Sequence, residues 1–278
     1  MTTAPLLTLN DGHPLPALGL GTYALNGAPG VEAIAGAIRA GYRLLDTAFN
    51  YENEGTVGAA VRRCGVPRDE LVVTSKLAGR HHRYDLAVDA IHESVYRLGL
   101  DHLDLMLIHW PNPVEDHYVE AWQALVDCQR KGLLRSIGVS NFLPEHLDRI
   151  SAATSVMPAV NQIQLHPYWP QLDQLAANAA RGVRVEAWSP LHKGALLDEP
   201  VLAAVAEAHG RTPAQVVLRW HVQLGSVPIP KATAPERQAA NLAVFDFELD
   251  PAQVAAISAL ARPEGGSAQW DPATHQEF

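Results

Sequence analysis

The sequence predicts an α/β protein, specifically a (β/α)8 TIM barrel with an N-terminal β-hairpin and extra helices near the C-terminus. Short apolar runs alternate with amphipathic helical patterns along nearly the whole chain, and eight runs have the length of strands. Several are apolar throughout, as at Leu105-Met106-Leu107-Ile108, which is typical of parallel strands covered on both faces. Because no linker or repeat interrupts the 278 residues, 47% of which are hydrophobic, one domain is expected over residues 1–278.

The chain begins with a hairpin pattern, since two short runs at residues 6–9 and 15–17 flank the turn signal Asn10-Asp11-Gly12. The eight strands follow, and in a barrel of this kind the groups that do chemistry lie at the strand ends and in the loops after them. The predicted strands are residues 18–21, 43–46, 71–76, 104–109, 136–140, 160–164, 184–188 and 227–230.

The helical stretches between the strands have recognisable ends. Glycine follows the patterns at residues 31–40, 84–98 and 118–131, as expected at a helix C-terminus. Thr212-Pro213 opens a helix over residues 214–224 with an N-cap and a proline at the first helical position. Further helices are predicted at residues 201–209, inserted between the seventh and eighth strands, at residues 235–243, and from Asp250-Pro251 to about residue 260, before an irregular tail at residues 265–278.

Composition excludes several classes of protein. The formal net charge is −9, without a basic stripe, so no nucleic-acid partner is expected. Two cysteines, Cys64 and Cys128, are too few for a disulfide framework or a cysteine zinc site, and no metal is expected. No apolar run approaches 18 residues and the N-terminus lacks a secretion signal, so we expect a cytoplasmic protein with no membrane partner.

One motif is misleading. Gly19-Leu20-Gly21-Thr22-Tyr23-Ala24 matches the dinucleotide fingerprint G-x-G-x-x-G/A, with Asp46 about 20 residues beyond it. That fingerprint needs a helix opening at the glycines, whereas the residues that follow, Asn26-Gly27-Ala28-Pro29-Gly30, are typical of a loop, and the helix is expected only near residue 31. A Rossmann fold is therefore disfavoured.

Four polar side chains follow neighbouring strands of the predicted barrel. Asp46, Lys76 and His109 end the second, third and fourth strands, and Tyr51 lies in the loop after Asp46. Taken singly, each has a structural explanation, as a cap, a solvated cation, a hydrogen-bonded imidazole or a packed ring. Together on one rim of a barrel, they favour an active site.

These residue types allow one particular chemistry. A tyrosine has an ordinary pKa of about 10, and an ammonium such as Lys76 nearby is expected to lower it. Asp46 would fix that ammonium, and His109 would orient a carbonyl oxygen that Tyr51 protonates. Because none of the four is an obvious nucleophile, the group that attacks the carbonyl carbon must come from elsewhere, and a reduced nicotinamide fits.

Two stretches resemble signatures of the aldo-keto reductase family. The first is Gly41-Tyr42-Arg43-Leu44-Leu45-Asp46-Thr47-Ala48 with Tyr51, Asn53-Glu54 and Val57-Gly58 after it, and the second is Ile229-Pro230-Lys231-Ala232-Thr233. The resemblance runs from the hairpin to the final helix. It is closest to the bacterial 2,5-diketogluconate reductases, which share Ser136-Ile137-Gly138-Val139-Ser140-Asn141.

The resemblance implies NADPH (NADP+) as the cofactor and a catalytic tetrad of Asp46, Tyr51, Lys76 and His109, with Tyr51 as general acid. It also implies residues for each part of the cofactor. Ser140, Asn141 and Gln162 would hold the nicotinamide carboxamide, Trp188 would stack on its ring, Ser189 and Leu191 would line the pyrophosphate, and Lys231, Ala232, Thr233, Arg237 and Asn241 would surround the 2′-phosphate and adenine.

The chain departs from the family pattern at three places. Ala232 stands where relatives commonly have serine, which removes a hydroxyl donor to the phosphate, and Ala240 stands where glutamate is frequent. Lys231 and Arg237 would still favour NADPH over NADH, unless both are simply solvated cations. Ala78 replaces a tryptophan of the subgroup, which should widen the substrate pocket.

The candidate substrate residues are aromatic apart from one amide, and each of them has packing as its alternative. No cation is expected at the mouth, so a strict requirement for a carboxylate substrate is not predicted. The candidates are Tyr23, Phe49, Asn50, Trp110 and Trp270.

Taken together, the sequence predicts a monomeric NADPH-dependent reductase acting on small aldehydes, dicarbonyls or keto-sugars. One alternative is a non-catalytic NADPH-binding regulatory subunit on the same barrel, although such a module needs no acid at Tyr51. Another is a barrel isomerase or hydrolase, which would act without any nicotinamide.

Overall fold

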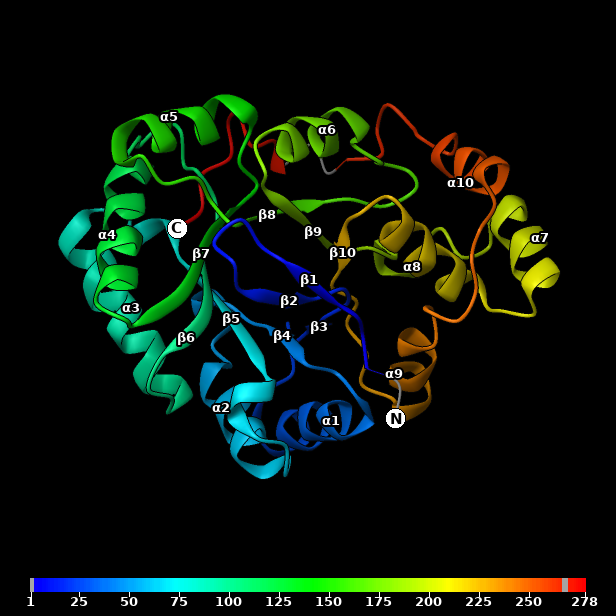
Figure 1. Cartoon of the computed structure of the whole chain (residues 1–278), viewed down its shortest axis with the longest axis horizontal. Helices are drawn as coiled ribbons and strands as arrows, with labels where there is room; N and C mark the ends of the chain where they lie inside the picture. Colours follow the sequence, from blue (N-terminus) through cyan, green and yellow to red (C-terminus); the bar gives the residue numbers. More distant parts are fainter. Residues whose placement is uncertain (1–2, 267–269) are drawn as a thin grey trace.

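The computed structural model, which describes residues 3–266 and 270–278, contains a parallel eight-stranded sheet curled into a barrel with helices around it (Figure 1). All eight predicted strands are confirmed, each with bounds within two residues of those expected. They are β3 (Leu20–Gly21), β4 (Leu44–Asp46), β5 (Val72–Leu77), β6 (Leu103–Ile108), β7 (Leu134–Ser140), β8 (Val160–Gln164), β9 (Arg184–Trp188) and β10 (Val227–Pro228).

The sheet closes into a barrel where the first strand meets the last, at Gly19 and Gly21 of the motif that resembles a dinucleotide fingerprint. The strands are paired in sequence order from β3 to β10, and the amides of Gly19 and Gly21 donate to the carbonyls of Pro228 and Pro230 at 3.1 Å. A Cβ at Gly19 would lie 2.7 Å from Ile229 Cδ1, so a side chain there would collide with the last strand. Close approach of the first strand to the last therefore explains these glycines, and the Rossmann fold is excluded.

The Rossmann fold was disfavoured partly because the first helix was expected to start only near residue 31, and this expectation was wrong. The first helix, α1 (Gly27–Ala40), begins at Gly27 and not near residue 31. Pro29 lies in its first turn, where a missing backbone N–H costs nothing because that group would have no partner inside the helix. The Gly-Pro composition that suggested a loop is thus compatible with the start of a helix.

The predicted hairpin consists of β1 (Leu6–Thr8) and β2 (Pro14–Pro16), paired antiparallel. Leu9 and Leu15 from the hairpin are buried in one cluster with Leu105 and Leu107 of the barrel interior. The hairpin therefore covers the end of the barrel at which the strands begin, and this leaves the opposite end for a site.

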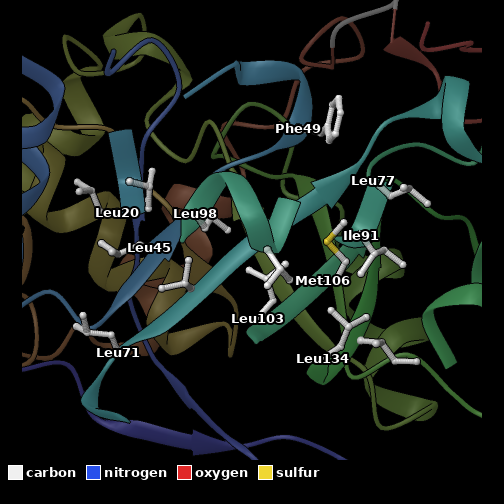
Figure 2. Packing of buried hydrophobic residues seen from close by; sticks show 14 of the residues in the cluster. Leu20, Leu45, Phe49, Leu71, Leu77, Ile91, Leu98, Leu103, Met106 and Leu134 are labelled. Atoms are coloured by element: carbon white, nitrogen blue, oxygen red, sulfur yellow. The ribbon is translucent and has the colours of Figure 1, made fainter. Parts of the chain in front are cut away.

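The helices form the outer layer, and their buried faces pack on the strands. Figure 2 shows Ile91 of a surrounding helix near Leu77 and Met106 of the strands, and all three are fully buried. The sequence analysis did not delimit α2 (Glu54–Arg63), α5 (Pro144–Thr154) or α6 (Leu172–Ala180). The other helices were predicted to within one residue at their start and two at their end: α3 (Tyr84–Leu98), α4 (Tyr118–Arg130), the inserted α7 (Pro200–His209), α8 (Pro213–Gln223), α9 (Pro235–Leu242) and α10 (Pro251–Ser258).

Three short 3-10 helices, η1 (Phe49–Tyr51), η3 (Gly79–His81) and η4 (His192–Gly194), follow β4, β5 and β9, and a fourth, η2 (Arg68–Glu70), precedes β5. The tail at residues 265–278 was predicted to be irregular. Its described part, residues 265–266 and 270–278, contains no α-helix or β-strand. Residues 267–269 lie outside the described residues. Among the described helices, none has both the length and the apolar character that crossing a membrane requires.

Gly58, in the first family signature, allows two helices to touch. A Cβ there would lie 1.8 Å from the carbonyl oxygen of Leu98, at the end of α3. We expect Gly58→Ala to destabilise the protein by about 1–3 kcal/mol, because a backbone carbonyl cannot move aside as a side chain can. Urea unfolding measures this change.

Gly55 on the same helix is the matched control, since a Cβ there would meet only the Arg97 carbonyl oxygen at an ordinary 3.7 Å. Gly55→Ala should be neutral or stabilise by up to about 1 kcal/mol through helix propensity. Equal unfolding midpoints for the two variants would contradict the proposed close approach.

Candidate active site

The predicted site residues meet at the rim where the strands end. Asp46 is the last residue of β4 and pairs in register with Thr74 of β5, and Lys76 lies two residues further along that strand. His109 directly follows β6, and its amide donates to the Leu77 carbonyl at 3.0 Å. Parallel pairing therefore brings these side chains, distant in sequence, to one edge of the sheet.

A buried ion pair joins Lys76 to Asp46. The Lys76 Nζ atom is 2.7 Å from each Asp46 carboxylate oxygen and 2.9 Å from the Thr47 carbonyl oxygen, which uses all three of its protons. Both side chains are almost inaccessible, at 1% and 6% exposure. Although burial lowers the pKa of Lys76, the charge and hydrogen bonds of Asp46 raise it above its ordinary value, so the ammonium stays charged.

Tyr51, at the end of η1, lies against this pair. The Lys76 Nζ atom is 5.1 Å from the centroid of its ring, and the His109 ring lies edge-on at 5.9 Å. Burial raises the pKa of Tyr51 above its ordinary value, and the positive charge of Lys76 offsets only part of that rise. The expected lowering of this pKa was therefore wrong, because the sequence does not reveal how strongly the hydroxyl is desolvated.

The signature residues Asn53 and Glu54 hold the loop that carries Tyr51. The Asn53 amide donates to the Thr22 carbonyl at 2.7 Å, and its own oxygen accepts from the Thr47 hydroxyl at 2.6 Å. The Ser75 hydroxyl donates to Glu54 at 2.6 Å. These buried contacts join the loops after β3 and β4 to β5. The sequence analysis quoted both residues but gave neither a role.

A carboxyl that the sequence analysis missed lies inside the barrel. The Gln162 Nε2 atom is 2.8 Å from Asp46 and 2.7 Å from Glu186, so one amide bridges two acids. Burial, together with the charge of Asp46, raises the pKa of Glu186 to about 7. A single acid between the apolar residues Val185 and Ala187 of a predicted strand was the available signal.

The residues expected around a nicotinamide form a hydrogen-bonded group. The Ser140 hydroxyl donates to the Gln162 carbonyl at 2.8 Å, and the Asn141 amide donates to the His109 carbonyl at 3.0 Å. The Trp188 indole N–H donates to Asn141 at 2.8 Å. Asn141 has a left-handed backbone, with φ of 62°, which aims its side chain back toward the strand ends.

The residues expected around the phosphates fit an anion. In the loop after β9, Ser189, His192 and Lys193 have left-handed backbones, with φ between 44° and 54°, so the segment turns sharply. Leu191 lies in the same segment. Lys231 and Arg237 make no ion pair with any of the described residues. Lys231 and Thr233 precede α9, Arg237 lies in its first turn, and all three side chains are exposed. Ala232 and Asn241 are buried, and Asn241 lies next to the Tyr42 hydroxyl.

Three of the candidate substrate residues, Tyr23, Trp110 and Trp270, contact aromatic rings of the site or the tail, whereas Phe49 belongs to the hydrophobic core. Tyr23 is 64% exposed, with its ring edge-on to Tyr51, and Trp270 packs against Trp188. Trp110 packs at an angle against His275 of the tail, with 4.3 Å between the ring centroids. Phe49, in contrast, packs beneath the guanidinium of Arg97, 4.2 Å from its ring centroid, within the main core cluster.

The wall at Ala78 is covered, contrary to the expected widening. Ala78 is fully buried, and its neighbour Gly79 contacts Glu277 of the tail. The Asn50 amide also donates to Glu277, at 2.8 Å. The C-terminal tail thus ends inside the site, which no pattern in the sequence indicated.

The fold and the site define a closed parallel barrel protein with a phenol, an ammonium, a carboxylate and an imidazole where its strands end. The model of the family described as aldo/keto reductase matches residues 17–262, which is most of the chain. The chain belongs to the aldo/keto reductase family.

Individual relatives cover all or most of the chain. The chain is 52% identical over 279 residues to 2,5-diketo-D-gluconic acid reductase B of Corynebacterium sp. (strain SHS752001), with 100% of both chains covered. It is 47% identical to morphine 6-dehydrogenase of Pseudomonas putida, over 92% of this chain and 91% of that protein.

Solved structures show the same architecture. The apo form of Gox0644 has a TM-score of 0.92 at 42% identity, covering 98% of this chain and 99% of that one. A mutant of Gox0644 in complex with NADPH has a TM-score of 0.93 at 41% identity, with the same coverage. The Bombyx mori aldo-keto reductase in complex with NADP has a TM-score of 0.88 at 36% identity, covering 94% of each chain.

Glu186 makes stability depend on pH. Because its pKa of about 7 in the folded protein exceeds the ordinary carboxyl value of 4.5, the folded state retains a proton that the unfolded chain loses between these pH values. The free energy of unfolding should therefore fall from about pH 5 to about pH 7.5, by a contribution of the order of 3 kcal/mol. Urea unfolding across this range measures it.

Glu186→Gln keeps an acceptor for Gln162 but cannot ionise, so its stability relative to wild type should increase as the pH rises. The control is Glu207→Gln on the exposed face of α7, which should follow the wild type. Parallel curves for Glu186→Gln and wild type would show that the buried carboxyl does not titrate as described.

Proposed function

We propose that the chain is an NADPH-dependent reductase that converts small aldehydes, dicarbonyls or keto-sugars into alcohols, with Tyr51 as the general acid. The single observation that carries this proposal is the buried Lys76–Asp46 pair lying against the Tyr51 ring, with His109 beside it at the strand ends. A binding module needs neither a desolvated phenol nor a fixed ammonium next to it.

Tyr51 has the protonation state that the reaction requires. Because burial raises its pKa, the hydroxyl keeps its proton at neutral pH and can donate it to the carbonyl oxygen. Once the proton has left, the phenolate is stabilised by the Lys76 charge, which Asp46 and the Thr47 carbonyl hold in place. Lys76 itself has no proton free for the substrate, so its role is electrostatic.

His109 and the residues beyond it position the reactants. The imidazole lies edge-on to Tyr51, where it can hydrogen-bond the same carbonyl oxygen and orient it. Trp188 and Asn141 would hold the nicotinamide, and Lys231 with Arg237 would bind the 2′-phosphate. When bound, NADPH supplies the hydride that adds to the carbonyl carbon.

The similar proteins support the cofactor and the substrate class. Gox0644 and the Bombyx mori enzyme have structures with NADPH and NADP, and the Corynebacterium relative is named for a diketo sugar acid. The rings of Tyr23 and Trp110 suit small substrates with an apolar face.

Tyr51→Phe should retain NADPH binding but reduce kcat with phenylglyoxal or methylglyoxal by at least about a hundredfold, because the proton donor is lost while the ring packing stays. NADPH oxidation at 340 nm measures turnover, and quenching of tryptophan fluorescence measures cofactor binding. Near-wild-type turnover would exclude Tyr51 as the acid. Cofactor binding by the wild type without turnover of any carbonyl tested would favour the non-catalytic subunit.

Lys231→Ala and Arg237→Ala should each raise the KM for NADPH by about tenfold or more, since a charge-assisted contact contributes about 1.5–3 kcal/mol. The KM for NADH, which has no 2′-phosphate, should change little. Arg130→Ala on α4 removes an exposed cation elsewhere and should change neither KM. Equal increases for both cofactors would place the phosphate at other residues.

A further inference from the structure

The C-terminal tail crosses the functional rim and is fixed there by its backbone. The Asn112 side chain donates to the Glu277 carbonyl at 2.7 Å and accepts from the Glu277 amide at 3.0 Å. Arg80 donates to the Phe278 carbonyl at 3.2 Å, and the His275 ring packs at an angle against Trp110. In Figure 1 the C-terminus, marked C, lies beside β7, which is far from it in sequence. The tail is therefore held in one register.

That register places the Glu277 carboxylate against three groups, the His109 ring, the Asn50 amide and the Gly79 backbone amide, which we call the carboxylate cradle. The first Glu277 oxygen is 2.6 Å from His109 Nδ1 and accepts from the Asn50 amide at 2.8 Å, and the second accepts from the Gly79 backbone amide at 3.0 Å. The Glu277 side chain is 11% exposed. The cradle thus satisfies both oxygens of a carboxylate.

Gly79 is required for this geometry. A Cβ at Gly79 would lie 2.3 Å from both the Glu277 carbonyl oxygen and the Asn112 amide nitrogen. Any side chain at this position would displace the tail, so the backbone amide can reach the carboxylate only because the residue is glycine. This close approach indicates a built site and not a chance contact of a chain end.

Glu277 is ionised, and its negative charge affects the pKa of Tyr51. Burial alone would raise its pKa, but His109, the Gly79 amide and Asn50 together lower it, so the carboxylate is ionised at neutral pH. Its charge also contributes to the raised pKa of Tyr51. A substrate carbonyl that reaches Tyr51 and His109 therefore lies next to a fixed negative charge.

We propose that Glu277 determines substrate charge: its carboxylate fills the cradle of His109, Asn50 and the Gly79 amide, so that the site accepts uncharged carbonyl compounds and disfavours those bearing a carboxylate beside the carbonyl. This inference rests on the proposed reductase function. Without the Glu277 carboxylate, the cradle becomes a binding site for the carboxylate of the substrate.

The test compares benzoylformate with its methyl ester, which differ mainly in one negative charge next to the ketone. For Glu277→Ala, the ratio of kcat/KM for the acid to that for the ester should rise by at least about tenfold over wild type, because a charge-assisted contact replaces a repulsion. Glu277→Gln removes the charge but still fills the cradle, so its ratio should rise less.

Two controls isolate the charge in the cradle. Gln276→Ala alters the neighbouring tail residue, and Glu115→Gln removes an exposed acid from the loop whose backbone contacts Gln276. Both should keep the wild-type ratio. A rise with either control equal to that of Glu277→Ala would assign the effect to tail mobility or to overall charge, and would overturn the proposal.

Binding of benzoate, which cannot be reduced, provides a readout that needs no turnover. Titration of tryptophan fluorescence should show benzoate binding at least about tenfold tighter to Glu277→Ala than to wild type. Equal affinity would overturn the inference even if the ester is reduced well. Conversely, absence of wild-type turnover on the ester and on phenylglyoxal would refute the reductase function, while tighter benzoate binding would still support the cradle.

Discussion

The ion pair between Lys76 and Asp46 is the constraint on which the site depends. Two charges are tolerated in the barrel interior only because every proton of the ammonium has an acceptor and both oxygens of the carboxylate have donors. Removing one partner would leave a buried charge without compensation. The pairing also requires β4, β5 and β8 to keep their register, so the chemistry at the rim and the closure of the barrel share the same contacts.

The two ends of the barrel have different tasks. At the end where the strands begin, Asp104 binds Arg68 at 2.6 Å and the Val73 amide at 2.9 Å, and the hairpin covers the interior. These contacts join neighbouring elements and have no chemistry to perform. At the opposite end, the charges surround a phenol and an imidazole. Such a division is general for parallel barrels, whose loops after the strands can vary without disturbing the core.

The sequence was sufficient to predict the strands, and because Asp46, Lys76 and His109 stand at or next to the ends of three of them, it also predicted that these three candidate residues share one rim. It was insufficient where burial or long-range packing decides the outcome. The sign of the Tyr51 pKa shift depends on desolvation, which no local pattern encodes. Glu277 lies in a segment without periodicity and meets Asn50 across 227 residues of chain. The cradle also uses the backbone amide of Gly79, and a glycine in a sequence does not by itself reveal that its amide meets a carboxylate.

The contacts of Glu277 have a consequence for proteolysis of the protein. Glu277 reaches Asn50 and His109 at the end of an irregular segment that follows α10, so a protease that cuts the backbone just after α10 would leave the barrel core intact and still alter the mouth of the barrel. The hairpin packs on the opposite end of the barrel, so a cut in its turn would leave the contacts of Glu277 in place.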